Sequence, residues 1–396
     1  MKVVDQLDLR GKRVFVRVDF NVPLEGDGKG GQRITDDARI RASLPTIRLV
    51  AECGAKVIIA AHLGRPKGKP DPAQSLAPTA HRLSELLGRP VALASDCVGP
   101  AAEAAVAKLA PGDVLLLENL RFHAEEEKND PAFAAQLARL ADVWVNDAFG
   151  AAHRAHASTA GMAPLVAERA SGFLMRDEMK HLGRLLAGAD RPFVAILGGS
   201  KVSDKIGVVE QLLSRIDALL VGGAMAYTFL VAKGIAVGGS RIESDKVDLA
   251  RETLAAAQAR GVRVFLPTDH VAARKPEAGS ETTICGPGIA DGWLGVDIGP
   301  ATREAYAKEI SAARTVLWNG PMGIFEIPAF AEGTLAVARA LAAARQATTV
   351  VGGGDSVAAI GVAGVTERIT HVSTGGGASL EFLEGRTLPG IAALES

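Results

Sequence analysis

The feature that most constrains the fold of this chain is an alternation of short apolar, β-branched runs with longer Ala- and Leu-rich stretches of helical period. The apolar runs of the first half are VFVRV (14–18), VIIAA (57–61), VLLLE (114–118) and VWVN (143–146). Parallel strands buried on both faces have this continuous apolar character, and the helices that follow them form right-handed crossovers. The alternation therefore predicts an α/β fold built on parallel sheets.

The second half continues this alternation with different sequences. Its apolar runs are VAIL (194–197), ALLV (218–221), VRVFLP (262–267), TVLW (315–318), TTVV (348–351) and HVS (371–373). A chain of 396 residues corresponds to two or three domains at about 100–200 residues each. We therefore expect two doubly wound, Rossmann-like lobes, at 1–170 and 189–379. A helix in SGFLMRDEMKHLGRLLAG (171–188) is expected to join them.

Charge and composition exclude several classes of protein. Lys and Arg total 44 against 45 Asp and Glu, so the chain lacks the basic excess of a general nucleic-acid binder. No apolar run reaches the ~18–20 residues that span a bilayer, and the N-terminal residues lack a signal-peptide stretch, which favours a cytoplasmic protein. Cys53, Cys97 and Cys285 are scattered and form no C-x-x-C pair. We expect them to be small buried residues rather than a disulfide framework or a zinc site.

Cationic and polar residues follow the predicted strands of the first half. They are Arg17, Asp19, Asn21, Arg39, His62, Arg65, Arg121, His153, Arg154 and His156. Ligands bind beyond the carboxyl ends of parallel strands, and guanidinium groups bind phosphate and carboxylate through paired hydrogen bonds. Together these residues predict a pocket for a small polyanion. Taken singly, each could be a solvated charge or a salt-bridge partner, and Asp19 and Asn21 could cap a turn.

Glycine follows the predicted strands of the second half, at 198–199, 222–223, 320, 352–354 and 375–377. Glycine lets backbone N–H groups approach a phosphate closely at a helix N-terminus. Lys201 and Lys205 are four apart, which places them on one face if they lie on a helix. Asp355 offers a hard oxygen ligand of the kind that Mg²⁺ prefers. These features predict a nucleotide polyphosphate with a metal. The alternatives are ordinary tight turns, a surface lysine stripe and an N-cap at Asp355.

Two phosphate-binding motifs do not apply to this chain. The P-loop pattern G-x-x-x-x-G-K-[ST] is missing from the sequence. The segment GDGKGG (26–31) matches G-x-G-x-x-G, but it follows the predicted strand by several residues, whereas the dinucleotide fingerprint requires an immediate strand-to-helix turn. We interpret 26–31 as an exposed loop and reject a dinucleotide-dependent oxidoreductase.

Longer motifs carry a family resemblance. They are RVDFNVP (17–23), HLGRP (62–66), LLLENLRFHAEEE (115–127), VNDAFGAAHRAH (145–156), ILGGSKVSDKI (196–206), WNGPMGIFE (318–326), VVGGGDS (350–356) and HVSTGGGASLEFLEG (371–385). From about residue 10 to its C-terminus, the chain resembles the phosphoglycerate kinases. The resemblance implies reversible, Mg²⁺-dependent phosphoryl transfer between ATP and the carboxylate of 3-phosphoglycerate, which gives ADP and 1,3-bisphosphoglycerate. It also implies a monomer whose lobes face each other across a hinged cleft, with segment 380–396 crossing back to the N-lobe.

The resemblance also implies the site residues, motif by motif. The N-lobe would bind 3-phosphoglycerate through Asp19, Asn21, Arg39, His62, Leu63, Gly64, Arg65, Arg121 and Arg154, with His153 and His156 nearby. The C-lobe would bind the nucleotide through Gly199, Ser200, Lys201, Lys205, Gly223, Gly295, Pro321, Glu326, Gly353, Gly354, Asp355 and Ser356. Glu326 would contact the ribose and Asp355 the metal. The catalytic groups would be Arg39, Lys201, Lys205 and Gly376. The chain departs from the family's usual GGGMA at Ala224, which concerns the adenine pocket, and from GGAKV at Ser200.

The implied reaction has a simple electrostatic requirement. The acceptor carboxylate is ionised at pH 7 and needs no general base, so catalysis depends on in-line positioning and on neutralising charge at the moving phosphoryl group. We expect Arg39 and Lys201 at its equatorial oxygens and Lys205 at the nucleotide phosphates. Arg65, Arg121 and Arg154 are expected at the 3-phosphate. Two alternatives stay open: another two-lobed phosphotransferase or nucleotide-dependent ligase, and a non-catalytic binding protein with this fold.

Overall fold

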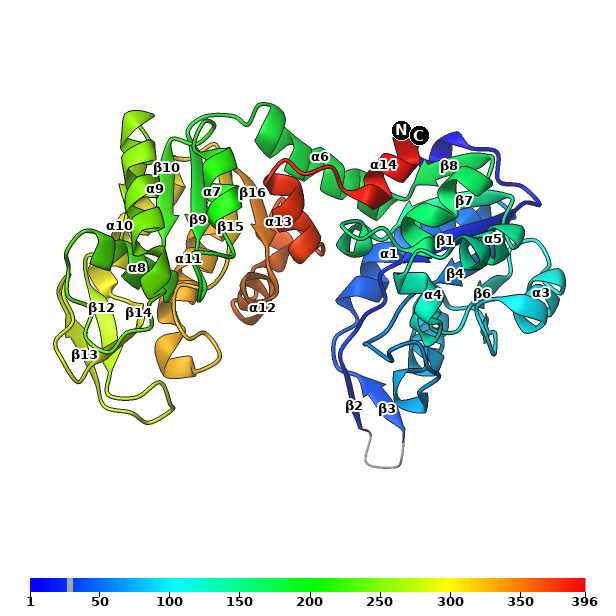
Figure 1. The fold of residues 1–396 in the computed structure, drawn as a ribbon, viewed down its shortest axis with the longest axis horizontal. Coiled ribbons are helices and arrows are strands. Elements are labelled where there is room, and N and C mark those ends of the chain that lie inside the picture. Colours follow the sequence, from blue (N-terminus) through cyan, green and yellow to red (C-terminus); the bar gives the residue numbers. More distant parts are fainter. Residues whose placement is uncertain (27–30, 396) are drawn as a thin grey trace. The chain divides into compact units, whose positions relative to one another are not determined.

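The computed structural model describes residues 1–26 and 31–395. The chain divides into two compact units, which are coloured along the sequence in Figure 1. Unit 1 is Met1–Lys180 with the C-terminal segment from Thr387, and unit 2 is His181–Arg386. Helix α6 (Phe173–Ala187) contains the division. Most of the segment that we interpret as an exposed loop, 27–30, lies outside the described residues.

Unit 1 is built on a six-stranded sheet with the order β5-β6-β4-β1-β7-β8, in which every neighbouring pair is parallel. Its strands are β1 (Arg13–Val18), β4 (Lys56–Ala60), β5 (Val91–Leu93), β6 (Val114–Leu116), β7 (Val143–Asp147) and β8 (Glu168–Ser171). Strands β4, β5 and β6 lie on one side of β1, and the chain then crosses to β7 on the other side. This crossing makes a topological switch point between β1 and β7, where α/β sheets bind ligands.

The sheet of unit 1 is covered on both faces. Val14 and Val16 lie in one apolar core with Ile47 of α1 and Leu83 of α2, whereas Phe15 alternates to the opposite face and is equally buried. The helices of unit 1 besides α6 are α1 (Ala38–Glu52), α2 (Ala77–Leu87), α3 (Gly99–Ala107), α4 (Ala124–Glu127), α5 (Pro131–Arg139) and α14 (Pro389–Glu395), and β2 (Leu24–Gly26) pairs antiparallel with β3 (Gln32–Ile34). Figure 1 shows α14 beside β8. From the neighbouring strand β7, Asn146 Nδ2 donates a hydrogen bond to the carbonyl of Gly390 in α14 (3.0 Å).

Unit 2 contains a second parallel six-stranded sheet, with the order β11-β10-β9-β15-β16-β17. Its strands are β9 (Phe193–Leu197), β10 (Ala218–Val221), β11 (Arg263–Phe265), β15 (Thr315–Asn319), β16 (Thr348–Gly352) and β17 (His371–Val372). Counted along the chain, this is the 3-2-1-4-5-6 order of nucleotide-binding folds, and its switch point lies between β9 and β15. The predicted α/β class with two parallel-sheet lobes is confirmed.

The helices of unit 2 follow its strands. They are α7 (Ile206–Leu212), α8 (Met225–Ala232), α9 (Val247–Ala259), α10 (Pro300–Ala312), α11 (Glu332–Ala343), α12 (Gly354–Val362) and α13 (Gly377–Leu383). A small antiparallel sheet, β13-β12-β14, was not predicted; its strands are β12 (His270–Ala273), β13 (Thr282–Cys285) and β14 (Leu294–Ile298). These strands are short, and none has the long continuous apolar run that marks the buried parallel strands. Strand β13, with the sequence TTIC, is also largely exposed.

Two further expectations can be compared with the structure. The three cysteines are free, but only Cys97 is buried, so the expected burial is wrong for Cys53, which is exposed at the end of α1. Cys285 is half-buried. None of the described helices is both long enough and apolar enough to cross a membrane.

Asp147, the last residue of β7, is fully buried and holds the start of α6. Its Oδ1 accepts a hydrogen bond from the backbone N–H of Met175 (3.1 Å). Gly172 makes this approach possible, because a Cβ at that position would collide with the Asp147 carboxyl group. Burial raises the pKa of Asp147 to about 6, and hydrogen bonds from Thr46 and from the amides of Met175 and Leu174 only partly oppose this rise.

The raised pKa of Asp147 predicts a specific pH dependence of stability. Below pH ~3 the carboxyl group is largely protonated in the folded and the unfolded chain alike. As pH rises, this residue ionises first in the unfolded chain. By pH 7 its ionisation has therefore lowered the free energy of unfolding by about 2–3 kcal/mol. Asp147→Asn removes the titration. Between pH 4 and 7, urea unfolding should therefore show the variant gaining about that much free energy of unfolding relative to the parent. A difference that stays constant over this range would contradict the prediction.

Candidate active site

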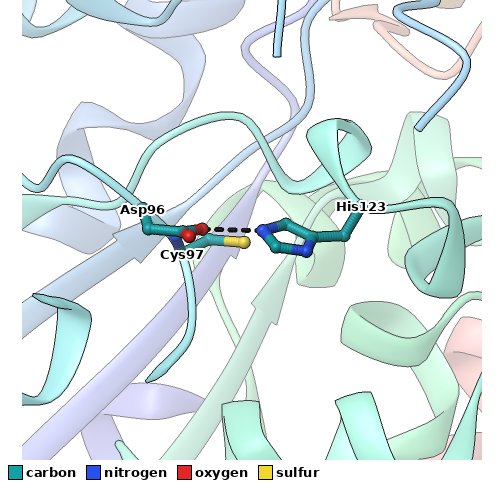
Figure 2. Close-up of side chains that lie close together, drawn as sticks. All are labelled: Asp96, Cys97 and His123. Atoms are coloured by element: carbon teal, nitrogen blue, oxygen red, sulfur yellow. Dashed lines mark hydrogen bonds and ion pairs between the residues drawn. The ribbon is translucent and has the colours of Figure 1, made fainter. Parts of the chain in front are cut away.

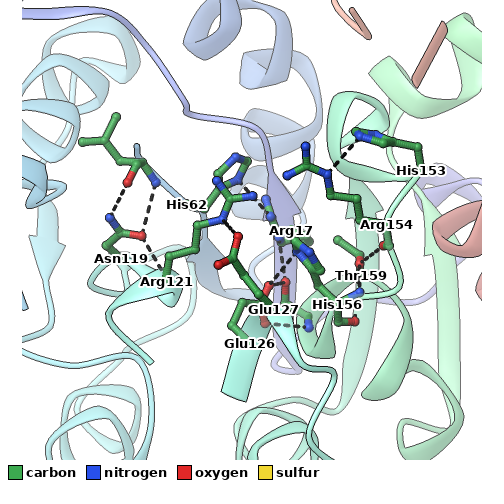
Figure 3. A network of polar contacts seen from close by, with 12 residues as sticks. Arg17, His62, Asn119, Arg121, Glu126, Glu127, His153, Arg154, His156 and Thr159 are labelled. Carbon is green, nitrogen blue, oxygen red and sulfur yellow. Dashed lines mark hydrogen bonds and ion pairs between the residues drawn. The ribbon is translucent and has the colours of Figure 1, made fainter. Parts of the chain in front are cut away.

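Arginine and histidine side chains of unit 1 gather beyond the carboxyl ends of its strands. Arg17, within β1, has no exposed surface; its Nε donates to Ser158 Oγ (2.8 Å), and its Nη2 lies 3.1 Å from His62 Nδ1. Figure 3 shows these groups converging with side chains from the segments that follow β6 and β7. We name the set the cationic cluster: Arg17, Arg39, His62, Arg121, Arg154 and His156.

The positive charge of this cluster resides on its arginines. Burial lowers the pKa of His62 well below its usual value, and the charges of Arg17 and Arg121 lower it further. Burial also lowers the pKa of His156 to about 3, again with help from Arg17 and Arg121. Both imidazoles are therefore neutral at pH 7. Several like charges held this close are stabilised by a bound anion, which is the property of a binding pocket for phosphate or carboxylate.

Arg39, a member of the cationic cluster, forms an ion pair with Asp19. Helix α1 begins at Ala38, so Arg39 lies in its first turn. Its Nη1 is 2.5 Å from Asp19 Oδ2, and the side chain remains 36% exposed against 13% for Asp19. Asp19 therefore orients a guanidinium group that solvent or a ligand can still reach. Asn21, two residues further on, accepts a hydrogen bond from the backbone N–H of Gly64 (2.9 Å).

Asn119 organises the loop that carries His62. This side chain has no exposed surface; its Oδ1 accepts hydrogen bonds from the amides of Leu63 (3.2 Å) and Arg121 (3.0 Å), and its Nδ2 donates to the carbonyl of Leu63 (2.7 Å). Arg121 in turn donates from Nη1 to the carbonyl of Gly64 (2.9 Å). Both backbone polar groups of Leu63 are thus hydrogen-bonded to Asn119. Leu63 would therefore contribute to a ligand site by fixing the shape of the loop.

The other arginines predicted for this site differ in exposure. The Arg121 side chain is 6% exposed, and its Nε lies 3.1 Å from Glu127 Oε1. Arg65 and Arg154 are exposed, and Arg154 Nε donates to His153 Nε2 (3.1 Å). Burial lowers the pKa of Arg121, and the positive charges of Arg17 and Arg154 lower it further, whereas the charge of Glu127 opposes this effect. Arg65 and Arg154 are therefore open to solvent, whereas Arg121 is held in place.

Glu126 is a structural member of this site that sequence reasoning missed. It is fully buried in α4 and accepts two hydrogen bonds from Ser158, from its amide (3.0 Å) and from its hydroxyl (2.5 Å). Ser158 also contacts Arg17, so Glu126 supplies the counter-charge for the most buried arginine of the cluster. Burial raises the pKa of Glu126, and the Arg17 charge opposes this rise. The only signal was the run AEEE (124–127), in which nothing distinguishes the glutamate that is buried.

In unit 2, three glycine turns pack backbone against backbone at the switch point between β9 and β15. A Cβ on Gly198 would collide with the Pro321 carbonyl, and a Cβ on Gly223 would lie 2.5 Å from the amide nitrogen of Gly199. The amide of Gly199 donates to the Pro321 carbonyl (2.9 Å), and that of Gly223 donates to the Met322 carbonyl (2.9 Å). The expectation that these N–H groups face a phosphate is therefore wrong for Gly199 and Gly223, where glycine permits close packing instead.

Lys201 and Lys205 do not share a helix face, which corrects the expectation from their spacing. Helix α7 begins only at Ile206, and Lys201 is exposed in the turn that precedes it. Lys205 is half-buried and donates a hydrogen bond to Asn319 Oδ1. Burial lowers the pKa of Lys205 to about 8, and the charges of Asp204 and Asp355 oppose this effect. Lys205 is thus held at the end of β15, whereas Lys201 is free to reorient.

The first turn of α12 completes this region. Gly353 precedes the helix with a φ of +88°, and Asp355 is exposed in the first turn, so the predicted N-cap alternative for Asp355 is wrong. Ser356 Oγ accepts a hydrogen bond from the amide of Gly320 (2.7 Å), which ties α12 to the turn after β15. Gly354 lies beside Asp355 and is also exposed. Gly376 precedes α13 with a φ of +54°, another left-handed conformation that favours glycine.

Gly295 and Glu326 lie around the small antiparallel sheet. Gly295 is in β14, where a Cβ would collide with the Tyr227 hydroxyl group of α8. Ala224, which precedes α8, packs against the same apolar cluster as Tyr227. Glu326 is exposed in the turn after β15, and the Ile324 amide of that turn donates to the Val296 carbonyl of β14 (2.8 Å). Ser200 is exposed after β9. The predicted nucleotide residues thus follow the carboxyl ends of β9, β10, β15 and β16, except for Gly295, which lies in β14.

Comparisons with known proteins agree with each other. A family model described as phosphoglycerate kinase matches residues 4–386. The curated phosphoglycerate kinase of Anaeromyxobacter sp. (strain K) is 60% identical over 398 residues, which cover 100% of this chain and 99% of the relative. The phosphoglycerate kinase of Synechococcus elongatus is 56% identical over 98% of this chain and 96% of the relative.

Two solved structures are similar over the full length. The phosphoglycerate kinase of Coxiella burnetii has a TM-score of 0.88 at 40% identity, with 99% of this chain and 98% of that chain covered. The phosphoglycerate kinase of Pyrococcus horikoshii has a TM-score of 0.86 at 37% identity, with 100% and 98% covered.

Proposed function

The chain belongs to the phosphoglycerate kinase family, and from this premise we propose that unit 1 binds 3-phosphoglycerate and that unit 2 binds the nucleotide. The observation that carries the proposal is the cationic cluster of unit 1. Its histidines are neutral at pH 7 and its arginines are charged, which suits a substrate with one phosphate and one carboxylate group. Unit 2 supplies Lys201, Lys205 and the glycine-preceded helix starts of α12 and α13, which suit a polyphosphate.

The proposed reaction is reversible transfer of the terminal phosphoryl group of ATP to the carboxylate of 3-phosphoglycerate. A bond forms between the carboxylate oxygen and phosphorus, the bond from phosphorus to the β-phosphate oxygen breaks, and ADP leaves with that oxygen. The acceptor is already ionised, so no protein group has to remove a proton. The residues of the chain contribute by position and charge, and because the group passes directly between two substrates, both sites must be filled at once.

On unit 1, we assign the substrate's 3-phosphate to Arg65, Arg121 and Arg154. The first and last are exposed and can adapt to the ligand, whereas Arg121 is held by Gly64 and Glu127. His62, fixed by Arg17 and by the loop that Asn119 organises, would orient the glycerate as a neutral hydrogen-bonding group. Asp19 and Asn21 would bind its polar groups. We assign Arg39 to the transferring phosphoryl group.

On unit 2, we assign Lys205 to the nucleotide phosphates and Lys201 to the transferring phosphoryl group. Lys205 is pre-oriented by Asn319, whereas Lys201 is exposed and can follow the group as it moves. The starts of α12 and α13, near Gly354 and Gly376, carry the positive ends of the helix dipoles, which favour anions. The region of Gly223, Ala224 and Gly295 would receive the adenine, with Glu326 at the ribose.

A magnesium ion fits the donors of this region. The exposed carboxylate of Asp355 is a hard oxygen ligand, and Mg²⁺ is usually bound by one or two carboxylates together with substrate phosphates. When bound, the ion would neutralise phosphate charge.

We further propose that the protein works as a cytoplasmic monomer. Sedimentation at assay concentration tests the oligomeric state.

A substrate-resolved assay tests the proposed function. ATP consumption, followed by coupling ADP release to a reporter reaction, should require both 3-phosphoglycerate and Mg²⁺. Glycerate without its phosphate and other small carboxylates should give little turnover, because the guanidinium groups at the 3-phosphate would have no partner. ATP consumption that is indifferent to 3-phosphoglycerate, or that prefers another acid, would point instead to another phosphotransferase or a ligase.

Arg65→Ala should mainly raise KM for 3-phosphoglycerate, by about tenfold, and change kcat by less than about threefold. The reason is that Arg65 is exposed and is assigned to a part of the substrate that does not react. Steady-state kinetics with each substrate varied in turn provide the measurement, and KM for ATP should not change. Lys67→Ala, an exposed cation two residues away, is the matched control. A large loss of kcat at unchanged KM would assign Arg65 a role in the chemical step instead.

A further inference from the structure

A group of three side chains separate from the proposed substrate sites brings sulfur, nitrogen and oxygen donors together. Asp96 and Cys97 follow β5, and His123 lies between the short helix η3 (Leu120–Phe122) and α4. In the part of the chain that the structure describes, one ligand atom of each residue lies within 4.8 Å of the other two. Figure 2 shows the His123 ring nitrogen directed at the Asp96 carboxylate, with the Cys97 sulfur beside it.

The spacing of these atoms is close to that of ligands on one metal ion. Zinc binds sulfur at about 2.3 Å and nitrogen or oxygen at about 2.0–2.2 Å, so two ligand atoms on a tetrahedral ion are about 3.3–3.8 Å apart. Asp96 Oδ1 and His123 Nε2 are 2.7 Å apart and share a proton as a hydrogen bond. Exchange of that proton for an ion requires these two atoms to separate by about 0.5–1 Å, which side-chain rotation can supply.

We propose that Asp96, Cys97 and His123 form a binding site for a divalent transition metal, with Zn²⁺ as the favoured ion and a water molecule in its fourth position. Thiolate and imidazole ligands select Zn²⁺ over Mg²⁺, which prefers oxygen ligands alone. The site therefore differs in chemistry from the one assigned to Asp355. The side chains of His123 and Asp96 are 30% and 43% exposed, which gives the ion a path from solvent, while the buried sulfur closes the inner side.

Metal binding at this site should release a proton. Burial raises the pKa of Cys97 well above its usual value, and the negative charges of Asp96 and, from α4, Glu126 add to the rise. The metal-free thiol is therefore protonated at neutral pH and has to give up its proton to become a ligand. Affinity should consequently increase with pH.

The site would also act on the neighbouring substrate residues. His123 directly follows η3, which carries Arg121, and Asp96 and Cys97 belong to the loop before α3. An ion held by all three residues would cross-link two segments that are otherwise joined by a single hydrogen bond between side chains of this group. Because the ion binds the folded chain, it should raise the thermal unfolding midpoint.

Binding of metal alone to the full-length protein tests this proposal. Chelator-treated protein should take up one Zn²⁺ per chain in competition with a chromophoric chelator, and Co²⁺ should give a thiolate-to-metal absorption band. Cys97→Ser should abolish that band. Cys97→Ser and His123→Gln should each weaken Zn²⁺ binding at least about tenfold. Cys53→Ser and His81→Gln are the matched controls, because Cys53 and His81 are exposed on unit 1 and should leave binding unchanged.

The proposal is overturned if Zn²⁺ does not bind at micromolar concentration, or if Cys97→Ser and His123→Gln bind it as the parent does. Loss of binding in a control variant instead would place the ion elsewhere on the surface. His123→Gln decides the question if Cys97→Ser does not fold, because His123 is partly exposed and its replacement leaves the buried sulfur in place. Circular dichroism of each variant establishes that it is folded.

Discussion

Arg39→Ala should lower kcat at least about a hundredfold while changing KM for either substrate much less, since this is the scale of losing one donor to transition-state charge. Arg39 is oriented by Asp19 at 2.5 Å yet remains 36% exposed, so its guanidinium group is positioned before the substrate arrives and is still available to it. An interaction that forms mainly in the transition state affects kcat and kcat/KM together. Steady-state kinetics in both directions of the reaction measure this.

Two further variants separate charge from geometry at this position. Arg39→Lys keeps the charge but loses the planar pair of donors, so it should recover only part of the activity. Arg41→Ala is the matched control: it lies on the same helix, is 54% exposed and pairs with Asp37, so its removal should cost less than about threefold. If Arg39→Ala turned over at a near-normal rate, Arg39 would have no role in the chemical step.

Lys205→Ala should lower kcat/KM for ATP by about two to three orders of magnitude, the range reported for loss of a preorganised charge at a phosphoryl site. Lys205 is half-buried and donates a hydrogen bond to Asn319 Oδ1, so its ammonium group has little freedom and is partly shielded from water. A charge held in this way acts more strongly on a phosphate than one on the surface. Kinetics with ATP varied, together with calorimetric binding of ADP, provide the measurement.

The control for Lys205 is Lys308→Ala, an exposed lysine on α10 of the same unit, which should behave as the parent. KM for 3-phosphoglycerate should stay within about threefold in Lys205→Ala, because the acid is assigned to unit 1. Normal ADP affinity with normal turnover in this variant would remove Lys205 from the nucleotide site. Normal affinity with low turnover would confine its action to the chemical step.

Local patterns predicted the elements that are long, apolar and buried. Strands β1, β7, β9 and β15 follow continuous apolar runs, and the structure has them within a residue or two of the expected ranges. Several of the strands that were missed contain no such run. Strand β8 has the polar sequence ERAS and is held at the sheet edge by its backbone, and β13 is largely exposed.

The sequence by itself determined the class of fold, the division into two sheets and the kinds of side chain at the strand ends, because periodicity and residue type are local properties. Only the tertiary structure decided which of these groups are buried and what they contact. Glu126 is the buried member of a run of glutamates, Gly199 and Gly223 use their amides to pack turns together, and Cys97 meets His123 from another segment. Burial and pairing arise between residues far apart in the chain, and their energies depend on solvent exclusion, which no local pattern records.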